Sequence, residues 1–143
     1  MATLGPDAMA ITENEFLVRL KPRRGQIKAT ITNQEFMAGI GNAYSDEILR
    51  AAGLHPHRRR AAMDEDDLRR LYRSMREVLE ESIAIVDATV QGEGLGKKEE
   101  WRQHLKVHRR AGEPCPKCGS EIRGQVRSGS ETNYCLTCQP LFE

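Results

Sequence analysis

Apolar residues recur at steps of three and four along residues 64 to about 90, the longest regular pattern in the chain. They share one face of a single amphipathic helix and are Leu68, Leu71, Tyr72, Met75, Val78, Leu79 and Val86. Asp64 suits the N-cap of this helix, and Asp66 and Asp67 favour its positively charged first turn. The pattern therefore predicts a long helix whose apolar face lies in a core.

Two short helices are predicted near the start of the chain. Thr12 and Glu15 have the spacing of a capping box, which begins a helix, and Pro22 ends it. The buried side of this helix is expected to hold Phe16, Leu17 and Leu20. A second helix is predicted over residues 25 to about 33, where two isoleucines lie four positions apart.

Two further helices complete the helical part. One runs from residue 42 to about 52 and ends at Gly53, which can adopt the left-handed conformation of a helix cap. The other covers residues 99 to 107, with Trp101 and Leu105 facing inward. The fold is therefore expected to be mainly α, a helical bundle followed by a small β structure that carries the cysteines.

The four cysteines form two matched Cys-x-x-Cys pairs, separated by sixteen residues. Four thiolates at this spacing suit the tetrahedral coordination of one zinc ion, with Cys115, Cys118, Cys135 and Cys138 as ligands. Two disulfides or four free thiols are the alternatives, but secreted disulfide scaffolds scatter their cysteines along the chain. We expect two short hairpins in a zinc ribbon whose folding depends on the metal, in a reducing cytoplasm.

The net charge of +1 conceals a segregation of charge along the chain. Residues 19–28 contain five basic side chains and no acidic one, and residues 55–60 contain a second basic cluster. Acidic residues concentrate at 64–67 and 77–81. An anionic polymer responds to such patches more than to the total charge, although a single basic run is also typical of an ordinary solvated surface.

The segment over residues 37–44 has the features of an anion site. Gly39 and Gly41 allow a tight turn with close backbone approach, and a helix start follows at once, with its free N–H groups and positive dipole end. Asn42 adds a neutral donor, and Lys28 is expected to reach the same anion. Taken alone, this segment is more typical of an ordinary helix–helix turn, but the basic stretch before it and the zinc ribbon after it favour an anion site.

Several short motifs occur in order along residues 4 to 140. They are Leu4-Gly5-Pro6-Asp7-Ala8, Ile27-Lys28, Gly39-Ile40-Gly41-Asn42-Ala43-Tyr44-Ser45-Asp46-Glu47-Ile48-Leu49, Ala52-Gly53-Leu54-His55-Pro56 and Tyr134-Cys135-Leu136-Thr137-Cys138-Gln139. Together they resemble the C-terminal half of the formamidopyrimidine-DNA glycosylase / endonuclease VIII (Fpg/Nei) family of base-excision repair enzymes.

The resemblance implies a helix–two-turns–helix domain followed by a zinc finger, both of which grip damaged duplex DNA. It divides the chain into a linker remnant (1–11), the helical domain (12–110) and the zinc ribbon (111–143). The residues implied at the phosphate beside the lesion are Lys28, Gly39, Gly41, Asn42 and Tyr44. The finger's hairpin tip, with Arg127, Ser130 and Thr132, is expected against the minor groove.

The chemistry of that family belongs to a separate N-terminal β-sandwich domain, whose nucleophile is an N-terminal proline followed by a glutamate. Here the chain begins Met1-Ala2-Thr3, and the nitrogen of Pro6 is an amide. We therefore expect no catalytic residue in this chain, which is either an excised piece or a truncated gene product. The amine of Ala2 offers weak reactivity toward an abasic aldehyde, without a pocket to support it.

Two positions depart from the family pattern. Ser130 occupies the place of the usual finger arginine, with Glu131 beside it, so weaker or altered DNA binding is expected. His108 follows Val107 where a tyrosine is usual.

The leading hypothesis is a monomeric, DNA-binding and zinc-binding portion of a DNA glycosylase/AP lyase, cytoplasmic and associated with the nucleoid, with no membrane partner. The alternative is a zinc-stabilised protein–protein module, or the non-catalytic half of a split enzyme that pairs with the missing catalytic domain.

Overall fold

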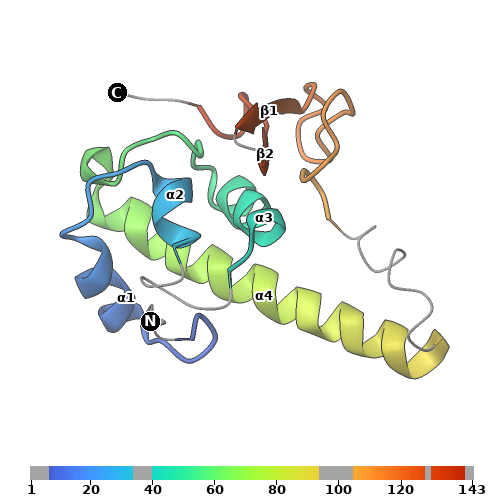
Figure 1. Ribbon diagram of the computed structural model, residues 1–143, viewed down its shortest axis with the longest axis horizontal. Coiled ribbons are helices and arrows are strands. Elements are labelled where there is room, and N and C mark those ends of the chain that lie inside the picture. The colour runs from blue at the N-terminus through green and yellow to red at the C-terminus, as the bar shows by residue number, and fades with distance from the viewer. Residues whose placement is uncertain (1–6, 34–39, 94–104, 128–129, 141–143) are drawn as a thin grey trace.

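A computed structural model describes residues 7–33, 40–93, 105–127 and 130–140. The elements in chain order are α1 (Glu13–Leu20), α2 (Ile27–Ile31), α3 (Asn42–Ala52), a short 3-10 helix (Arg60–Ala62), α4 (Glu65–Glu93), β1 (Arg123–Arg127) and β2 (Ser130–Tyr134). α4 runs along the molecule, with α1, α2 and α3 gathered at its N-terminal half (Figure 1). The β1–β2 hairpin lies on the side of α3, so the chain is mainly helical with one small sheet.

The helical core follows the predicted pattern. Phe16, Leu17 and Leu20 of α1 are buried, and so are Leu68, Leu71, Met75 and Leu79 of α4. The capping box at α1 is confirmed, because the Thr12 hydroxyl accepts from the Glu15 amide and the Glu15 carboxylate accepts from the Thr12 amide. Tyr72 packs against Phe16, with ring centroids 5.4 Å apart, and donates its hydroxyl proton to the Ile11 carbonyl.

The end of α3 ties the helical part to the finger. Gly53 adopts the predicted left-handed conformation, with φ of 72°. A Cβ at this position would come within 3.2 Å of the Cys138 carbonyl oxygen, so the glycine also permits a close backbone approach. Next to it, the Leu54 carbonyl accepts from the buried amide of Gln139.

Two predicted elements are corrected. α2 is shorter than residues 25–33, because the Ile27 amide donates to the Arg58 carbonyl of a neighbouring loop and α2 ends at its C-cap Thr32. The helix predicted over 99–107 does not include Leu105 to Val107, whose backbone turns toward α3 instead. Its remaining part, with Trp101, lies outside the described residues.

The zinc ribbon contains one hairpin among the described residues, where two were predicted. β1 and β2 pair antiparallel, with Arg127 opposite Ser130. The first cysteine pair sits in a turn closed by a single bridge between Pro114 and Glu121. A small second core joins Val107 and Ile122 to Cys115 and Cys135, so this region has little apolar material apart from its thiols.

Candidate metal centre and anion site

The four thiols converge on one point. The Sγ atoms of Cys115 and Cys138 are 3.9 Å apart, those of Cys118 and Cys135 are 3.4 Å apart, and all four lie within 4.8 Å of one another. A tetrahedron of Zn–S bonds of about 2.3 Å has edges of about 3.8 Å. The cluster therefore has the donor set and the size of a structural site for one zinc ion, and the four cysteines could bind it.

The surroundings of the thiols shift the pKa values of Cys118 and Cys138 in opposite directions. Hydrogen bonds from the Ser120 side chain and backbone lower the pKa of Cys118 to about 6. Burial and the neighbouring thiols raise the pKa of Cys138 to about 12. A metal ion must displace the remaining protons, so binding releases protons and weakens in acid.

The predicted anion residues meet the finger at the start of α3. Gly41 is the N-cap in an extended conformation, and within the described chain no side chain caps this helix end. Asn42 donates its side-chain amide to the Glu131 carbonyl of β2 (2.9 Å). The structure thus brings Asn42 and the finger strand together, while Gly39 lies outside the described residues.

Lys28 lies at the same junction with its ammonium group held by three acceptors. They are Asp46 Oδ1 (2.8 Å), Thr132 Oγ1 (2.7 Å) and the Glu131 carbonyl oxygen (3.3 Å). An ammonium group has three protons, so each has an acceptor here. The contact with Glu131 is the longest and weakest of the three.

Two buried carboxylates of α3 that sequence reasoning missed hold the finger in place. The side chain of Asp46 is fully buried. Its carboxylate accepts from His108 Nδ1 (2.7 Å), from the backbone amide of Asn133 (3.0 Å) and from the Lys28 ammonium. Buried charges are stable only when they are paired and hydrogen-bonded in this way. His108, the departure from the family pattern, therefore has a structural partner.

Glu47 receives three consecutive backbone amides. Its Oε1 accepts from Lys106 (2.7 Å), and its Oε2 accepts from Val107 (2.9 Å) and His108 (2.8 Å). This binding explains why residues 105–107 are not helical. No local signal in the sequence marks these partners of Glu47, which lie about sixty positions further along the chain.

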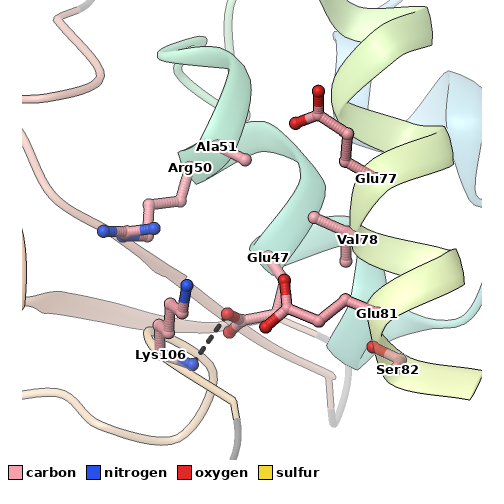
Figure 2. A pocket seen from close by; sticks show the side chains of 8 residues that line it. All are labelled: Glu47, Arg50, Ala51, Glu77, Val78, Glu81, Ser82 and Lys106. Carbon is pink, nitrogen blue, oxygen red and sulfur yellow. Dashed lines mark hydrogen bonds between the residues drawn. The ribbon is translucent and has the colours of Figure 1, made fainter. Parts of the chain in front are cut away.

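A cavity of about 140 Å³ lies beside Glu47 and is lined by residues of α3 and α4 (Figure 2). Its lining residues are Glu47, Arg50, Ala51, Glu77, Val78, Glu81, Ser82 and Lys106. Figure 2 shows the Glu47 carboxylate directed at the Lys106 backbone, to which a dashed line joins it. Both signs of charge line this cavity, which lies where α3 and α4 meet the segment around Lys106.

The other predicted contact residues are placed differently. Tyr44 is half-buried and packs against the helical core. Thr132 is half-buried and accepts from Lys28. Arg127 and Ser130 face each other in the strand register at the hairpin tip, and their side chains lie outside the described residues.

His55 forms a second contact between the helical part and β2. Its ring lies 4.5 Å from that of Tyr134 and 5.2 Å from that of His57. Burial, together with the charge of His57, lowers the pKa of His55 to about 4. The ring is therefore neutral at pH 7, and its Nδ1 accepts from the His57 amide.

The fold and the thiol cluster define a mainly helical protein with a four-cysteine zinc finger docked on its third helix. The chain belongs to the formamidopyrimidine-DNA glycosylase family. The family model described as "Formamidopyrimidine-DNA glycosylase H2TH domain" matches residues 4–93, and that described as "Zinc finger found in FPG and IleRS" matches residues 112–141.

Individual relatives agree with this assignment. The chain is 37% identical over 140 residues to the formamidopyrimidine-DNA glycosylase of Heliobacterium modesticaldum, covering 95% of this chain and 50% of that protein. It is 40% identical over 136 residues to an "uncharacterized formamidopyrimidine-DNA glycosylase-like protein" of Mycobacterium tuberculosis, covering 95% of this chain and 84% of that one.

Solved structures show the same fold. The Lactococcus lactis Fpg bound to DNA with an abasic site matches with a TM-score of 0.82 and 29% identity, over 96% of this chain and 52% of that chain. The MutM (Fpg) protein of Thermus thermophilus matches with a TM-score of 0.80 and 35% identity, over 98% and 55%. This chain thus spans about half the length of these two proteins.

No helix in the described part of the chain is both long enough and apolar enough to span a lipid bilayer.

Proposed function

We propose that this chain is the DNA-binding portion of a base-excision-repair DNA glycosylase/AP lyase, and that it holds duplex DNA without catalysing the reaction itself. The observation that carries the proposal is the junction of α3 and β2. There the Asn42 side-chain amide and the Lys28 ammonium both donate to the backbone carbonyl of Glu131, next to a helix start that has no side-chain cap. The DNA-bound Lactococcus relative supports duplex DNA as the ligand.

The donors at this junction suit a phosphate. The first turn of α3 offers backbone N–H groups and a positive dipole end, which bind anions without a formal charge. Asn42 begins that turn, and Lys28 lies beside it. We propose that a phosphate oxygen replaces the Glu131 carbonyl at Lys28, because that bond is the longest of the three. Gly39, Gly41 and Tyr44 would shape the turn, and Tyr44 would do so from its half-buried position.

The helical domain (12–110) and the zinc ribbon (111–143) would act as one surface, after a linker over 1–11. We propose that α2 and α3 form the helix–two-turns–helix motif. The hairpin tip with Arg127, Ser130 and Thr132 would reach the minor groove, less strongly than with an arginine at position 130. Zinc-bound thiolates and a duplex ligand together suit the cytoplasm and its nucleoid, and we propose a monomer.

Titration of a labelled duplex carrying an abasic-site analogue tests the proposal. Affinity should fall with salt by about 0.9 in log K per phosphate contact for each tenfold increase. Asn42→Ala should weaken binding roughly tenfold or more, to intact and damaged duplex alike. Asn14→Ala, the same change at an exposed asparagine of α1, should leave affinity unchanged. Binding that ignores both salt and Asn42→Ala would contradict the proposal.

A second candidate is a partner for a separate catalytic domain. The Mycobacterium relative, 84% of which this chain covers, supports it, because a protein of nearly this length exists in that organism. Val126 on β1 is 71% exposed, which offers an apolar contact point. Pull-down with the N-terminal domain of a full-length relative tests this candidate, and Val126→Ser should weaken capture.

A further inference from the structure

The two basic segments of the sequence form one structural unit. The loop before α2 and the loop after α3 are joined by backbone hydrogen bonds from Arg60 to Gly25 (3.0 Å) and from Ile27 to Arg58 (2.8 Å). Gln26 and Arg59 form an antiparallel bridge between them. In Figure 1 the two loops run side by side at the start of α2. Residues more than thirty positions apart thus share one rigid surface.

Arg60 fixes the loop before α2 without losing its charge to a carboxylate. Its Nη2 donates to the Lys21 carbonyl (2.7 Å) and its Nε donates to the Arg23 carbonyl (3.0 Å). Carbonyl groups carry no formal charge, so these bonds leave the positive charge of the Arg60 guanidinium uncompensated. Arg58 differs, because its guanidinium pairs with the carboxylate of Asp67 at 3.2 Å, a carboxylate that it shares with Arg70.

Three further cations stand on this unit with exposed side chains, namely Lys21, Arg24 and Arg59. Together with Arg60 they form what we call the basic patch. The loop–loop hydrogen bonds and the Arg60 bonds to the Lys21 and Arg23 carbonyls hold together the two segments that carry these cations. Such a patch favours a ligand with a regular row of negative charges over a single anion.

The basic patch continues directly into the proposed phosphate site. The Lys28 backbone amide donates to the Pro56 carbonyl, so the pairing between the two loops extends to Lys28. The ammonium group of Lys28 in turn bonds Asp46, one helical turn after Asn42. Arg24 and Lys28 are four residues apart, a span of at most ~14 Å between their Cα atoms. That span corresponds to roughly four base steps along a duplex.

We infer that the basic patch is a second phosphate-binding surface, which holds the duplex backbone within about four base pairs of the phosphate at Asn42. Arginine forks suit phosphate oxygens, and the continuity with the first site favours duplex DNA over a protein or a membrane as the ligand. The inference rests on the proposed function and adds a second contact to it.

The test compares wild-type protein with the triple variant Lys21→Gln/Arg24→Gln/Arg59→Gln. Arg60 is kept because it holds the loop. Loss of two to three phosphate contacts should lower the salt slope of log K by about 2 to 3 and weaken binding roughly 10- to 100-fold or more at 0.1 M salt. Arg73→Gln, which removes an exposed charge from α4, is the matched control and should change neither value.

Duplex length gives a second readout. Removing base pairs from one end of a duplex of about 20 base pairs should weaken binding by the wild-type protein, and it should leave the triple variant unaffected. If the triple variant keeps the wild-type slope and affinity while Asn42→Ala weakens binding, the basic patch does not bind DNA and the proposed function still holds. The patch would then suit an acidic protein. If neither variant changes binding, both proposals fail.

Discussion

Glu47→Ala tests whether a buried carboxylate docks the finger. The substitution removes the acceptor of three backbone N–H groups, at 2.7, 2.8 and 2.9 Å. Lys106 is exposed, so water can replace the carboxylate there, but Val107 and His108 are buried. Two orphaned buried donors at about 1–3 kcal/mol each give a loss of about 2–6 kcal/mol.

The neighbouring cavity places the loss in the lower part of that range. Glu47 lines the cavity of about 140 Å³ between α3 and α4, and water entering there can reach part of the vacated space. We therefore expect a cost of about 2–3 kcal/mol, which corresponds to roughly a 30- to 150-fold change in an opening equilibrium.

Amide hydrogen exchange is the direct assay, because it resolves docking from global unfolding. In Glu47→Ala, protection at Val107 and His108 should fall by that factor, while protection in α1 should be unchanged. Glu47→Gln keeps one oxygen acceptor and should lose less. Glu81→Ala removes an exposed carboxylate from the same cavity and should have no effect at Val107. Wild-type protection at Val107 and His108 in Glu47→Ala would refute the reasoning.

The remaining predictions concern the metal, a buried histidine and a glycine. Removing zinc with a chelator should abolish protection around Cys115 and Cys135, whose core is small, while far-UV circular dichroism keeps the signal of the separately packed helices; loss of the helical signal would contradict this. The pKa of His55 is lowered to about 4 from an unfolded value of about 6.5, so it is neutral in both states above pH 6.5, and stability falls as pH drops from 6.5 toward 4. At pH 5 this protonation of the unfolded state lowers the free energy of unfolding by about 2 kcal/mol. In urea unfolding, His55→Gln should therefore lose less stability than wild type between pH 7 and pH 5. Gly53→Ala should lower stability by about 1–3 kcal/mol in thermal unfolding, since φ is 72° and the new Cβ would meet the Cys138 carbonyl. Gly112→Ala, at φ of 89° with no atom within 4 Å of its Cβ, should lose only the backbone part, and an equal loss at both glycines would show that the Cys138 contact is harmless.

Local signals predicted much of this structure. The capping box at Thr12, the left-handed cap at Gly53 and the thiol cluster each depend on residues close in sequence, so their chemistry is visible in a short segment. The apolar face of α4 was predictable because helical periodicity extends over many residues.

Long-range polar contacts were not predictable in the same way. Residues 105–107 have an acceptable helical pattern. They do not form a helix, because the backbone amides of residues 106–108 donate to the Glu47 carboxylate instead. The partner lies about sixty positions earlier, and a single sequence does not reveal such pairs. For Lys28 the sequence suggested a phosphate, and the structure shows Asp46, Thr132 and the Glu131 carbonyl already bonded to it.

The junction of α3 and β2 follows from matched spacings. Asn42 and Asp46 are four residues apart on one face of α3, a rise of about 6 Å. Their partners on β2, the Glu131 carbonyl and the Asn133 amide, are two residues apart, a rise of about 6.6 Å. Helix and strand therefore stay in register over this contact, and both polar side chains of the helix reach the strand without distortion. A rotation of α3 that moved Asn42 away from the finger would also expose the charge of Asp46, so the anion site and the finger are fixed by the same buried carboxylate.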